Sequence, residues 1–451
     1  MVGFIGNSLQ FNHQTIDTLK VDLRQRNLGG VILMGVNQNL QNISQMKALT
    51  DTLQKYSSTP LFISTDQEGG NVARLNSSNG FLNTSTAFRL GTTLNREDST
   101  RRQASIMAGW LKQVGINTNF APVVDVNVNP QSPAIGRLER SFSSDTIIVY
   151  NHAKWFVDEF KRRDIITTMK HFPGHGSATV DSHLGFTDIT STWRSLELYP
   201  YKRLVNENYV DMIMTGHLFN RNFDSTYPAT LSFNTITNLL RNQIGYNGVV
   251  ISDAMFMGAI VNNYSFEDAI VLTINAGVDI LLYTTNLTQG TEKHSITRRI
   301  IEIVERKISE GVISPNRINE SYNRIMQLKS KYLQTSIASD DFNQPNSFEM
   351  KNYPNPFNPN TKIRFTIPSS VINANSNSSQ KNNNGISQES FFVMLKIYDI
   401  LGNEVATLLN EEKFSGVYEI DFNGANLSSG IYFSVLRVND KILTNKMLLL
   451  R

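Results

Sequence analysis

The chain has 451 residues, which is too long for one ordinary hydrophobic core and predicts two or more domains. Its net charge of +3 is small for this length, and no cluster of Lys and Arg indicates a nucleic-acid partner. The absence of Cys excludes disulfides, thiol catalysis and Cys-ligated metals. No apolar run is long enough to span a bilayer, and the first residues lack the features of a signal peptide.

Residues 1–335 alternate short apolar runs with amphipathic stretches, which is typical of βα units around a parallel sheet. The apolar runs that we interpret as buried strands are 31–34, 61–64, 117–121, 165–169, 211–215, 249–252 and 278–282. Together with one poorly marked strand, they predict an α/β fold, a (β/α)8 TIM-type barrel. A doubly wound open sheet is the alternative, but no Gly-x-Gly-x-x-Gly motif follows a first strand.

Ionisable residues follow five of these predicted strands. They are Asp66, Asp125, Lys170 with His171, His217 and Asp253. In a barrel, the carboxyl ends of all strands open on one face, where active sites lie. The sequence therefore predicts that these side chains gather at one rim.

The composition and the hydrophobic pattern of the chain change after residue 335. Residues 336–350 are polar and form a predicted linker, and 351–451 form a predicted small all-β, immunoglobulin-like sandwich. Its expected strands are 362–367, 393–398, 404–409, 417–422, 431–438 and 442–449. The Asn/Ser-rich segment 371–389 is expected to be a disordered loop between two of them.

Residues 170–183 are dense in Lys, His and Asp, and a proline and two glycines make the segment a loop after a buried strand. A metal site at His171 and His175 is one interpretation, but the intervening Pro-Gly prevents the helix that would align them, so we predict no metal. Lys170 beside His171 suits a donor pair for a polar ligand. A structural role for His175, satisfying backbone groups of the loop, is at least as plausible as a functional one.

Two further patterns could supply acid–base or nucleophilic chemistry. Asp181 stands two residues before His183, and a carboxylate there can fix the tautomer of the imidazole and favour its charged form. A Ser-His-Asp hydrolase is an alternative, but no Gly-x-Ser-x-Gly elbow follows a strand. Asp253, at the end of an apolar strand, is either a structural cap or a nucleophile.

Several motifs in the first 330 residues occur in a characteristic order. They are Asp66-Gln67-Glu68-Gly69-Gly70, Asn119-Phe120-Ala121-Pro122 with Asp125, Arg140-Ser141-Phe142, Lys170-His171-Phe172-Pro173-Gly174-His175-Gly176 with Asp181-Ser182-His183, Pro228-Ala229-Thr230-Leu231-Ser232 and Val250-Ile251-Ser252-Asp253. This set resembles glycoside hydrolase family 3, in its β-N-acetylhexosaminidase branch. The chain departs from that pattern at Asn71, where Arg is usual, and at Ala254, where a second Asp is usual.

The resemblance implies a retaining exo-β-N-acetylglucosaminidase that acts on chitin oligosaccharides or peptidoglycan fragments without metal or organic cofactor. It implies that Asp253 is the nucleophile, that His183 is the general acid/base and that Asp181 orients His183. The residues implied to hold the sugar hydroxyls are Asp66, Arg74, Arg140, Lys170 and His171. The alternatives are a phosphorylase, since some relatives with a His acid/base pass the sugar to phosphate, and a non-catalytic surface glycan-binding protein.

The C-terminal part carries motifs of its own. They are Asn352-Tyr353-Pro354-Asn355-Pro356-Phe357-Asn358-Pro359, Ile397-Tyr398-Asp399-Ile400-Leu401-Gly402 and Leu427-Ser428-Ser429-Gly430-Ile431-Tyr432. They resemble a type IX secretion C-terminal sorting domain, which implies the type IX machinery as a partner and a secreted or cell-surface monomer. A carbohydrate-binding module is the alternative, but no row of Trp or Tyr suits sugar stacking. Because export needs a signal that this sequence lacks, we expect a longer natural N-terminus.

Overall fold

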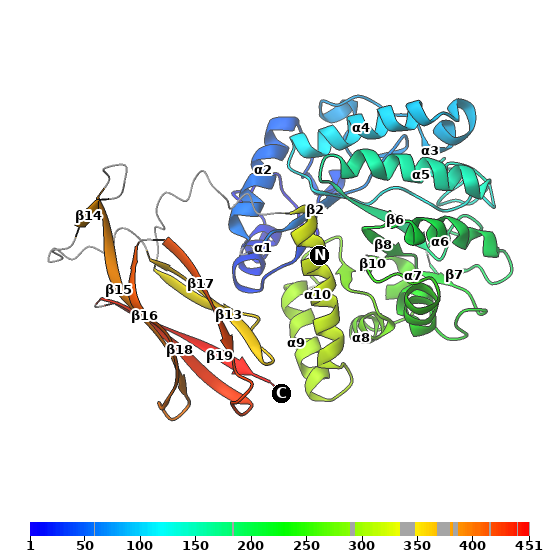
Figure 1. Cartoon of the computed structure of the whole chain (residues 1–451). Coiled ribbons are helices and arrows are strands. Elements are labelled where there is room, and N and C mark those ends of the chain that lie inside the picture. Colours follow the sequence, from blue (N-terminus) through cyan, green and yellow to red (C-terminus); the bar gives the residue numbers. More distant parts are fainter. Residues whose placement is uncertain are drawn as a thin grey trace. The chain divides into compact units, whose positions relative to one another are not determined.

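The computed structural model describes residues 1–57, 59–182, 185–288, 294–333, 348–367, 379–381, 387–414, 416–439 and 441–450. The chain divides into two compact units, Met1–Gln334 and Thr335–Arg451 (Figure 1). Among the helices of these described ranges, none combines the length and apolarity needed to cross a membrane.

The described part of the first unit is built on a seven-stranded parallel sheet, with the order β1-β2-β5-β6-β8-β10-β11. Its strands are β1 (Gly30–Ile32), β2 (Phe62–Thr65), β5 (Thr118–Asn119), β6 (Ile166–Phe172), β8 (Met212–Thr215), β10 (Val249–Ala254) and β11 (Ile280–Leu282). Each overlaps one of the apolar runs in the sequence. Such runs are expected because strands of a parallel sheet are buried on both faces.

Residues 1–3 close this sheet into a ring. Val2 forms parallel bridges to Val31 in β1 and to Tyr283, the residue after β11. The Val2 amide donates to the Gly30 carbonyl at 3.2 Å, and the Gly3 amide donates to the Tyr283 carbonyl at 2.8 Å. The first unit is therefore a TIM-like α/β domain, and its poorly marked strand is this short N-terminal segment.

Helices surround the strands of this unit (Figure 1). The longer ones are α1 (Gln14–Gln25), α2 (Ile43–Tyr56), α4 (Glu97–Gln113), α5 (Thr146–Lys161), α6 (Tyr199–Asn206), α8 (Phe266–Ala276), α9 (Ile296–Ser309) and α10 (Pro315–Tyr332). Several begin where the sequence supplies a capping side chain: Asp145 accepts the Ile147 amide at α5, and Ser265 accepts the Asp268 amide at α8. The α8 helix ends at Gly277, whose φ of 113° suits glycine.

Shorter elements occupy the connections that follow the strands. They are the strands β3 (Gln67–Gly69), β4 (Val72–Ala73), β7 (Thr187–Asp188) and β9 (Leu218–Phe219), the short helices α3 (Ala87–Arg89) and α7 (Gly258–Val261), the 3₁₀ helices η1 (Gly35–Asn37), η2 (Ser77–Asn79), η4 (Ser195–Leu198) and η5 (Ala229–Leu231), and the π-helical segments η3 (Leu90–Leu94) and η6 (Asn234–Gln243). Two pairs among them, β3 with β4 and β7 with β9, form small sheets of their own. The connections after β2, β6 and β8 are therefore ordered by short β pairs.

The second unit consists of antiparallel strands. The strands β12 (Glu349–Tyr353), β13 (Asn360–Ile367) and β17 (Gly416–Asn423) form one sheet. The other sheet contains β14 (Ser379–Lys381), β15 (Ser387–Asp399), β16 (Glu404–Phe414), β18 (Gly430–Val438) and β19 (Lys441–Leu449). One apolar core, which includes Phe365 on β13 and Leu395 on β15, joins the two sheets.

The six strands expected in the second unit are present, but the sequence missed β12. This strand begins at Glu349, inside the predicted linker 336–350, because its polar residues hide the alternation. The rest of that linker, up to residue 347, lies outside the described residues. Within the segment 371–389, expected to be disordered, β14 and the start of β15 are strands, and residues 371–378 and 382–386 lie outside the described residues.

Candidate active site

A buried group of charged side chains lies at the carboxyl ends of β2 and β6. Lys170, whose side chain is 2% exposed, donates from Nζ to Asp66 Oδ1 at 2.8 Å and lies 2.7 Å from Glu68 Oε1. Arg140 makes a bidentate pair with Glu68, with Nε and Nη2 each 2.8 Å from a carboxylate oxygen. Two cations and two carboxylates therefore share one site below the rim.

The charges in this group stabilise one another. Burial alone would raise the pKa of Glu68, but the Arg140 and Lys170 charges outweigh it and hold that pKa well below its usual range. Burial alone would lower the pKa of Lys170, but Asp66 and Glu68 outweigh it and raise that pKa. Glu68 and Lys170 are consequently both charged near pH 7.

Arg74, which follows β4, reaches the same group from its exposed side. Its Nη2 lies 3.7 Å from Asp66 Oδ2, and its side chain is 34% exposed. The Nε of Arg74 is buried and has no hydrogen-bond partner among the residues that the structure describes. A buried donor without a partner is costly, so this atom is suited to a ligand oxygen.

Asp125 organises the two histidines that begin the His-rich segment. Its Oδ2 lies 2.8 Å from His171 Nδ1, and its Oδ1 accepts the backbone amides of His171 at 3.0 Å and His175 at 2.8 Å. Burial alone would raise the pKa of Asp125, but the two histidines lower it. The His171 Nε2 lies 3.4 Å from Arg140 Nη2, which joins this histidine to the charged group.

His175 behaves differently from His171. It is buried, and its burial beside His171 lowers its pKa to about 4, so it is neutral near pH 7. Its Nε2 lies 3.2 Å from the Ser182 hydroxyl. These contacts lie within one segment, which favours the structural role that the sequence left open for His175.

The structure corrects one boundary. The sequence predicted a strand at 165–169 and a loop from residue 170, but β6 continues through Phe172 and includes Lys170 and His171. A charged or polar residue can occupy a buried strand when it has partners there. Lys170 pairs with Asp66 and Glu68, and His171 contacts Asp125. The glycine-rich loop begins only after this point.

Asp253 lies half-buried in β10, one residue before the end of the strand. Its Oδ1 accepts the Ala254 amide at 2.7 Å. The neighbouring strand β8 leads into His217, whose Nε2 donates to the Ala254 carbonyl at 3.0 Å. His217 thus supports the backbone beside Asp253 and is part of the rim as the sequence predicted.

Asp181 is half-buried and lies at the end of the His-rich segment. The next residue, Ser182, accepts the amide of Ala259 at 3.3 Å through its carbonyl. Ala259 belongs to α7, which begins five residues after Asp253, so this bond holds the segment against the connection that follows β10. His183 itself lies outside the described residues, and its role as general acid/base stays a prediction.

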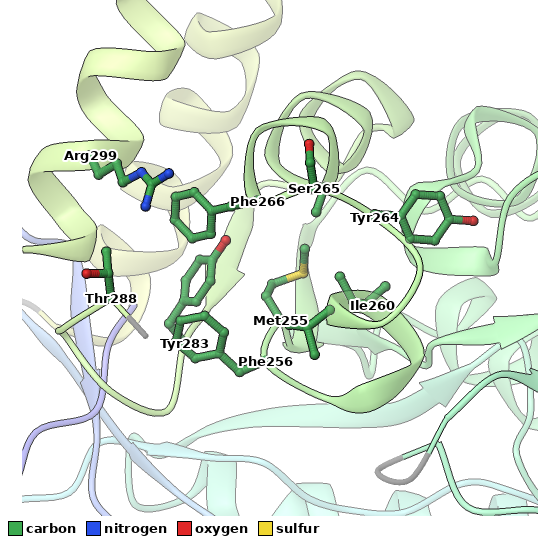
Figure 2. Close-up of a pocket in the computed structure, with 11 residues that line it drawn as sticks. Met255, Phe256, Ile260, Tyr264, Ser265, Phe266, Tyr283, Thr288 and Arg299 are labelled. Atoms are coloured by element: carbon green, nitrogen blue, oxygen red, sulfur yellow. The ribbon is translucent and has the colours of Figure 1, made fainter. Parts of the chain in front are cut away.

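An apolar pocket of about 210 Å³ lies beside the residues that directly follow β10 (Figure 2). Its wall includes Met255 and Phe256, and the Phe256 ring lies 5.0 Å from that of Tyr283. Arg299 lies over the Phe266 ring at 4.7 Å. Among the described residues that line it, none is a carboxylate or a histidine.

The structure brings five of the eight predicted site residues into one connected network: Asp66, Arg74, Arg140, Lys170 and His171. Asp253 lies near the carboxyl end of β10, and Asp181 lies on the connection that follows β6. The sequence analysis did not predict that Glu68 belongs to this network. Its place in the Asp66–Gly70 motif could have indicated it. In the described ranges, no three His, Asp or Glu side chains are grouped to hold a metal ion.

Comparisons with known proteins identify relatives of the first unit. The model of the glycosyl hydrolase family 3 N-terminal domain matches residues 5–328. Beta-hexosaminidase A of Pseudoalteromonas piscicida is 32% identical over 332 residues, 69% of this chain and 54% of the relative. A beta-hexosaminidase of Tolumonas auensis is 34% identical over 268 residues, 58% of this chain and 78% of the relative.

A solved structure shares the fold. It is a glycoside hydrolase family 3 beta-N-acetylglucosaminidase from Paenibacillus sp. str. FPU-7, with a TM-score of 0.66 and 30% identity. The match covers 76% of this chain and 62% of that one. The chain thus spans just over half of the Pseudoalteromonas relative and less than two thirds of the Paenibacillus protein.

Proposed function

The chain belongs to glycosyl hydrolase family 3, and we propose that it is a retaining exo-β-N-acetylglucosaminidase. It would remove terminal β-linked N-acetylglucosamine from chitin oligosaccharides or peptidoglycan fragments. The observation that carries this proposal is the buried donor network around Lys170, His171 and Arg140, on the rim to which β10 brings Asp253. The names of the hexosaminidase relatives support the choice of sugar.

In the proposed first step, a carboxylate oxygen of Asp253 attacks the anomeric carbon, and the bond to the leaving oxygen breaks. His183 gives its proton to that oxygen, so a glycosyl-enzyme ester and a neutral leaving group form. In the second step, neutral His183 takes a proton from water, which attacks the same carbon and releases Asp253. Two displacements at one carbon retain the β configuration.

The charged network would hold the sugar while these steps occur. Lys170 and Arg74 point donors at the region around Asp66, and a pyranose hydroxyl can both donate to Asp66 and accept from them. The partnerless Nε of Arg74 suits one such hydroxyl. Because ion pairs already fix these side chains, little ordering is needed when the substrate binds.

The direct test is turnover of a chromogenic β-N-acetylglucosaminide and of N,N′-diacetylchitobiose, with and without inorganic phosphate. We expect free N-acetylglucosamine as the main product under both conditions, with the β anomer formed first. Sugar-1-phosphate as the main product would instead identify a phosphorylase. The absence of turnover on both substrates would favour a glycan-binding protein.

For the second unit we propose an immunoglobulin-like sorting domain of the type IX system, which would place the protein outside the cell or on its surface. Its two antiparallel sheets around one core are compatible with this assignment, and its motifs support it. Residues 351–451 fused to a periplasm-directed reporter should carry that reporter across the outer membrane of a type IX host. Retention of the reporter in the periplasm would contradict this proposal.

A further inference from the structure

Glu68, on the short strand β3, bridges the two buried cations of the site. Its Oε1 accepts a hydrogen bond from Arg140 Nη2 at 2.8 Å and lies 2.7 Å from Lys170 Nζ, and its Oε2 accepts from Arg140 Nε at 2.8 Å. Lys170 comes from β6, and Arg140 comes from the connection after β5. Glu68 therefore joins two cations that the chain delivers from separate elements.

The two carboxylates of this charged group differ in their exposure. The Asp66 side chain is 18% exposed and also lies near Arg74, whereas the Glu68 side chain is 5% exposed. Asp66 thus lies on the open side of the group, where a sugar can reach it, and Glu68 lies on the closed side. Both oxygens of Glu68 are engaged with cations, so Glu68 acts on a ligand through Lys170 and Arg140.

Without Glu68, the two cations would repel each other. The Nζ of Lys170 and the Nη2 of Arg140 both contact the same oxygen, Glu68 Oε1. Burial and the Arg140 charge act to lower the pKa of Lys170, and the carboxylates of Asp66 and Glu68 outweigh them. Two like charges this close cost free energy unless a counter-charge lies between them, and Glu68 supplies that charge.

The neighbours of Glu68 in the chain fix its backbone. The Leu75 amide donates to Gln67 Oε1 at 2.8 Å, and Gln67 Nε2 donates to the Leu75 carbonyl at 3.0 Å. Further along, Gly70 has a φ of 58°, and a Cβ there would lie 2.4 Å from Thr86 Cγ2. The carboxylate of Glu68 is therefore presented from a backbone that is held on both sides.

We propose that Glu68 is a positioning residue, which holds the Lys170 ammonium and the Arg140 guanidinium side by side so that both meet the sugar without rearrangement. This inference rests on the proposed function, because it takes the ligand of the two cations to be N-acetylglucosamine. Donors that are already in place need little ordering when a ligand binds. Glu68 should therefore set the affinity for the sugar and leave the chemical step on Asp253 largely unaffected.

The test measures binding of the hydroximolactone of N-acetylglucosamine by calorimetry, together with KM and kcat on the chromogenic substrate. This analogue has a planar anomeric carbon and should bind more tightly than the sugar. In Glu68→Gln, which keeps the shape of the side chain but not its charge, we expect Kd and KM to rise about 10- to 100-fold. The value of kcat should change less than about threefold, since the lost binding is shared by substrate and transition state.

A second variant separates the charge of Glu68 from its reach. Glu68→Asp keeps the charge but is one carbon shorter, so it cannot contact both cations at their present separation. We expect its Kd for the hydroximolactone to rise about tenfold. If Glu68→Gln does not fold, the Kd of Glu68→Asp decides alone, because only a positioning role makes the length of this side chain matter for affinity.

A pH profile of the same Kd adds a readout that a loss of packing would not move. The charged groups that act on Lys170 are Asp66, Glu68 and Arg140. Because Glu68 raises the pKa of Lys170, a neutral replacement lowers that pKa, and Lys170 then loses its proton at a lower pH than in wild type. Between about pH 7 and pH 10, Kd should therefore rise in Glu68→Gln and stay nearly flat in wild type and in Glu68→Asp.

The matched control is Glu159→Gln, since Glu159 is also buried and pairs with two cations, Arg101 and Arg162. It should lower the melting temperature and leave Kd and its pH profile unchanged. A Kd in both Glu68 variants within about threefold of this control would overturn the positioning role. A loss of affinity in Glu68→Gln that is the same at every pH would overturn it as well.

Failure of the proposed function would look different. Wild-type protein that binds no hydroximolactone would contradict N-acetylglucosamine as the ligand. Wild-type protein that binds it without turning over the chromogenic substrate would contradict the activity, while the comparison of Kd values would still decide the role of Glu68.

Discussion

Replacing the proposed nucleophile in an Asp253→Ala variant is expected to lower kcat by about 10⁴-fold or more on every substrate. Asp253 is the carboxylate that β10 brings to the rim. Asp66 and Glu68 hold Lys170 and Arg140, and Asp125 contacts His171. An attack by Asp66, Glu68 or Asp125 would break the contacts that these carboxylates make with their partners. Steady-state rates on the chromogenic substrate measure the loss.

The same variant should fold normally. Asp253 is half-buried and contributes a charge to the rim and not volume to the core, so the melting temperature should stay within a few degrees of wild type. The control is Asp98→Ala, since Asp98 is 90% exposed on α4 and should be silent in both measurements. Wild-type-like turnover by the Asp253 variant would remove this residue from the mechanism.

A His183→Ala variant should show a loss that depends on the leaving group. On N,N′-diacetylchitobiose, kcat/KM should fall about 10²- to 10⁴-fold, because the departing sugar needs a proton. On a dinitrophenyl substrate, kcat/KM should be nearly unchanged, although kcat falls because His183 also activates water. Added azide should restore this kcat and give the β-glycosyl azide, since an anion needs no base.

The control for this variant is His13→Ala, which removes the capping imidazole of α1 far along the chain. It should change stability without separating the two substrates. Equal losses of kcat/KM on good and poor leaving groups in His183→Ala would assign His183 a structural role and leave the proton donor to be found elsewhere.

The barrel strands were accessible from the sequence because parallel strands are buried on both faces and read as continuous apolar runs. The segment at Val2 that closes the ring could not be predicted from the sequence, because a strand formed by single bridges has no periodic pattern. The end of β6 was also misplaced. The sequence around Lys170 and His171 suggests loop residues, because their partners are distant in the chain. Glu68 on β3 pairs with Lys170, and Asp125, on the connection after β5, contacts His171.

The residues of the site likewise divide into those that the sequence predicted and those that it did not. Motif order pointed to Asp66, Arg140, Lys170 and His171, which the fold joins through hydrogen bonds. Glu197 on η4 is a buried glutamate whose Oε2 accepts the Gly176 amide at 3.1 Å. It carries no comparable signal, because a glutamate in an amphipathic stretch normally faces solvent. Only the packing of η4 against the glycine-rich loop, two segments about 20 residues apart, buries that carboxyl group.

The central claim is that the reaction passes through a covalent ester on Asp253. The most direct measurement uses an N-acetylglucosaminyl fluoride with a second fluorine at C5, which slows both displacements while the fluoride leaving group preserves the first. After incubation and digestion, mass spectrometry should find one sugar on the peptide that contains Asp253, and none in Asp253→Ala. A label on another residue would contradict the claim, and so would the absence of label from an enzyme that a thiazoline inhibits, since that pattern indicates substrate-assisted catalysis.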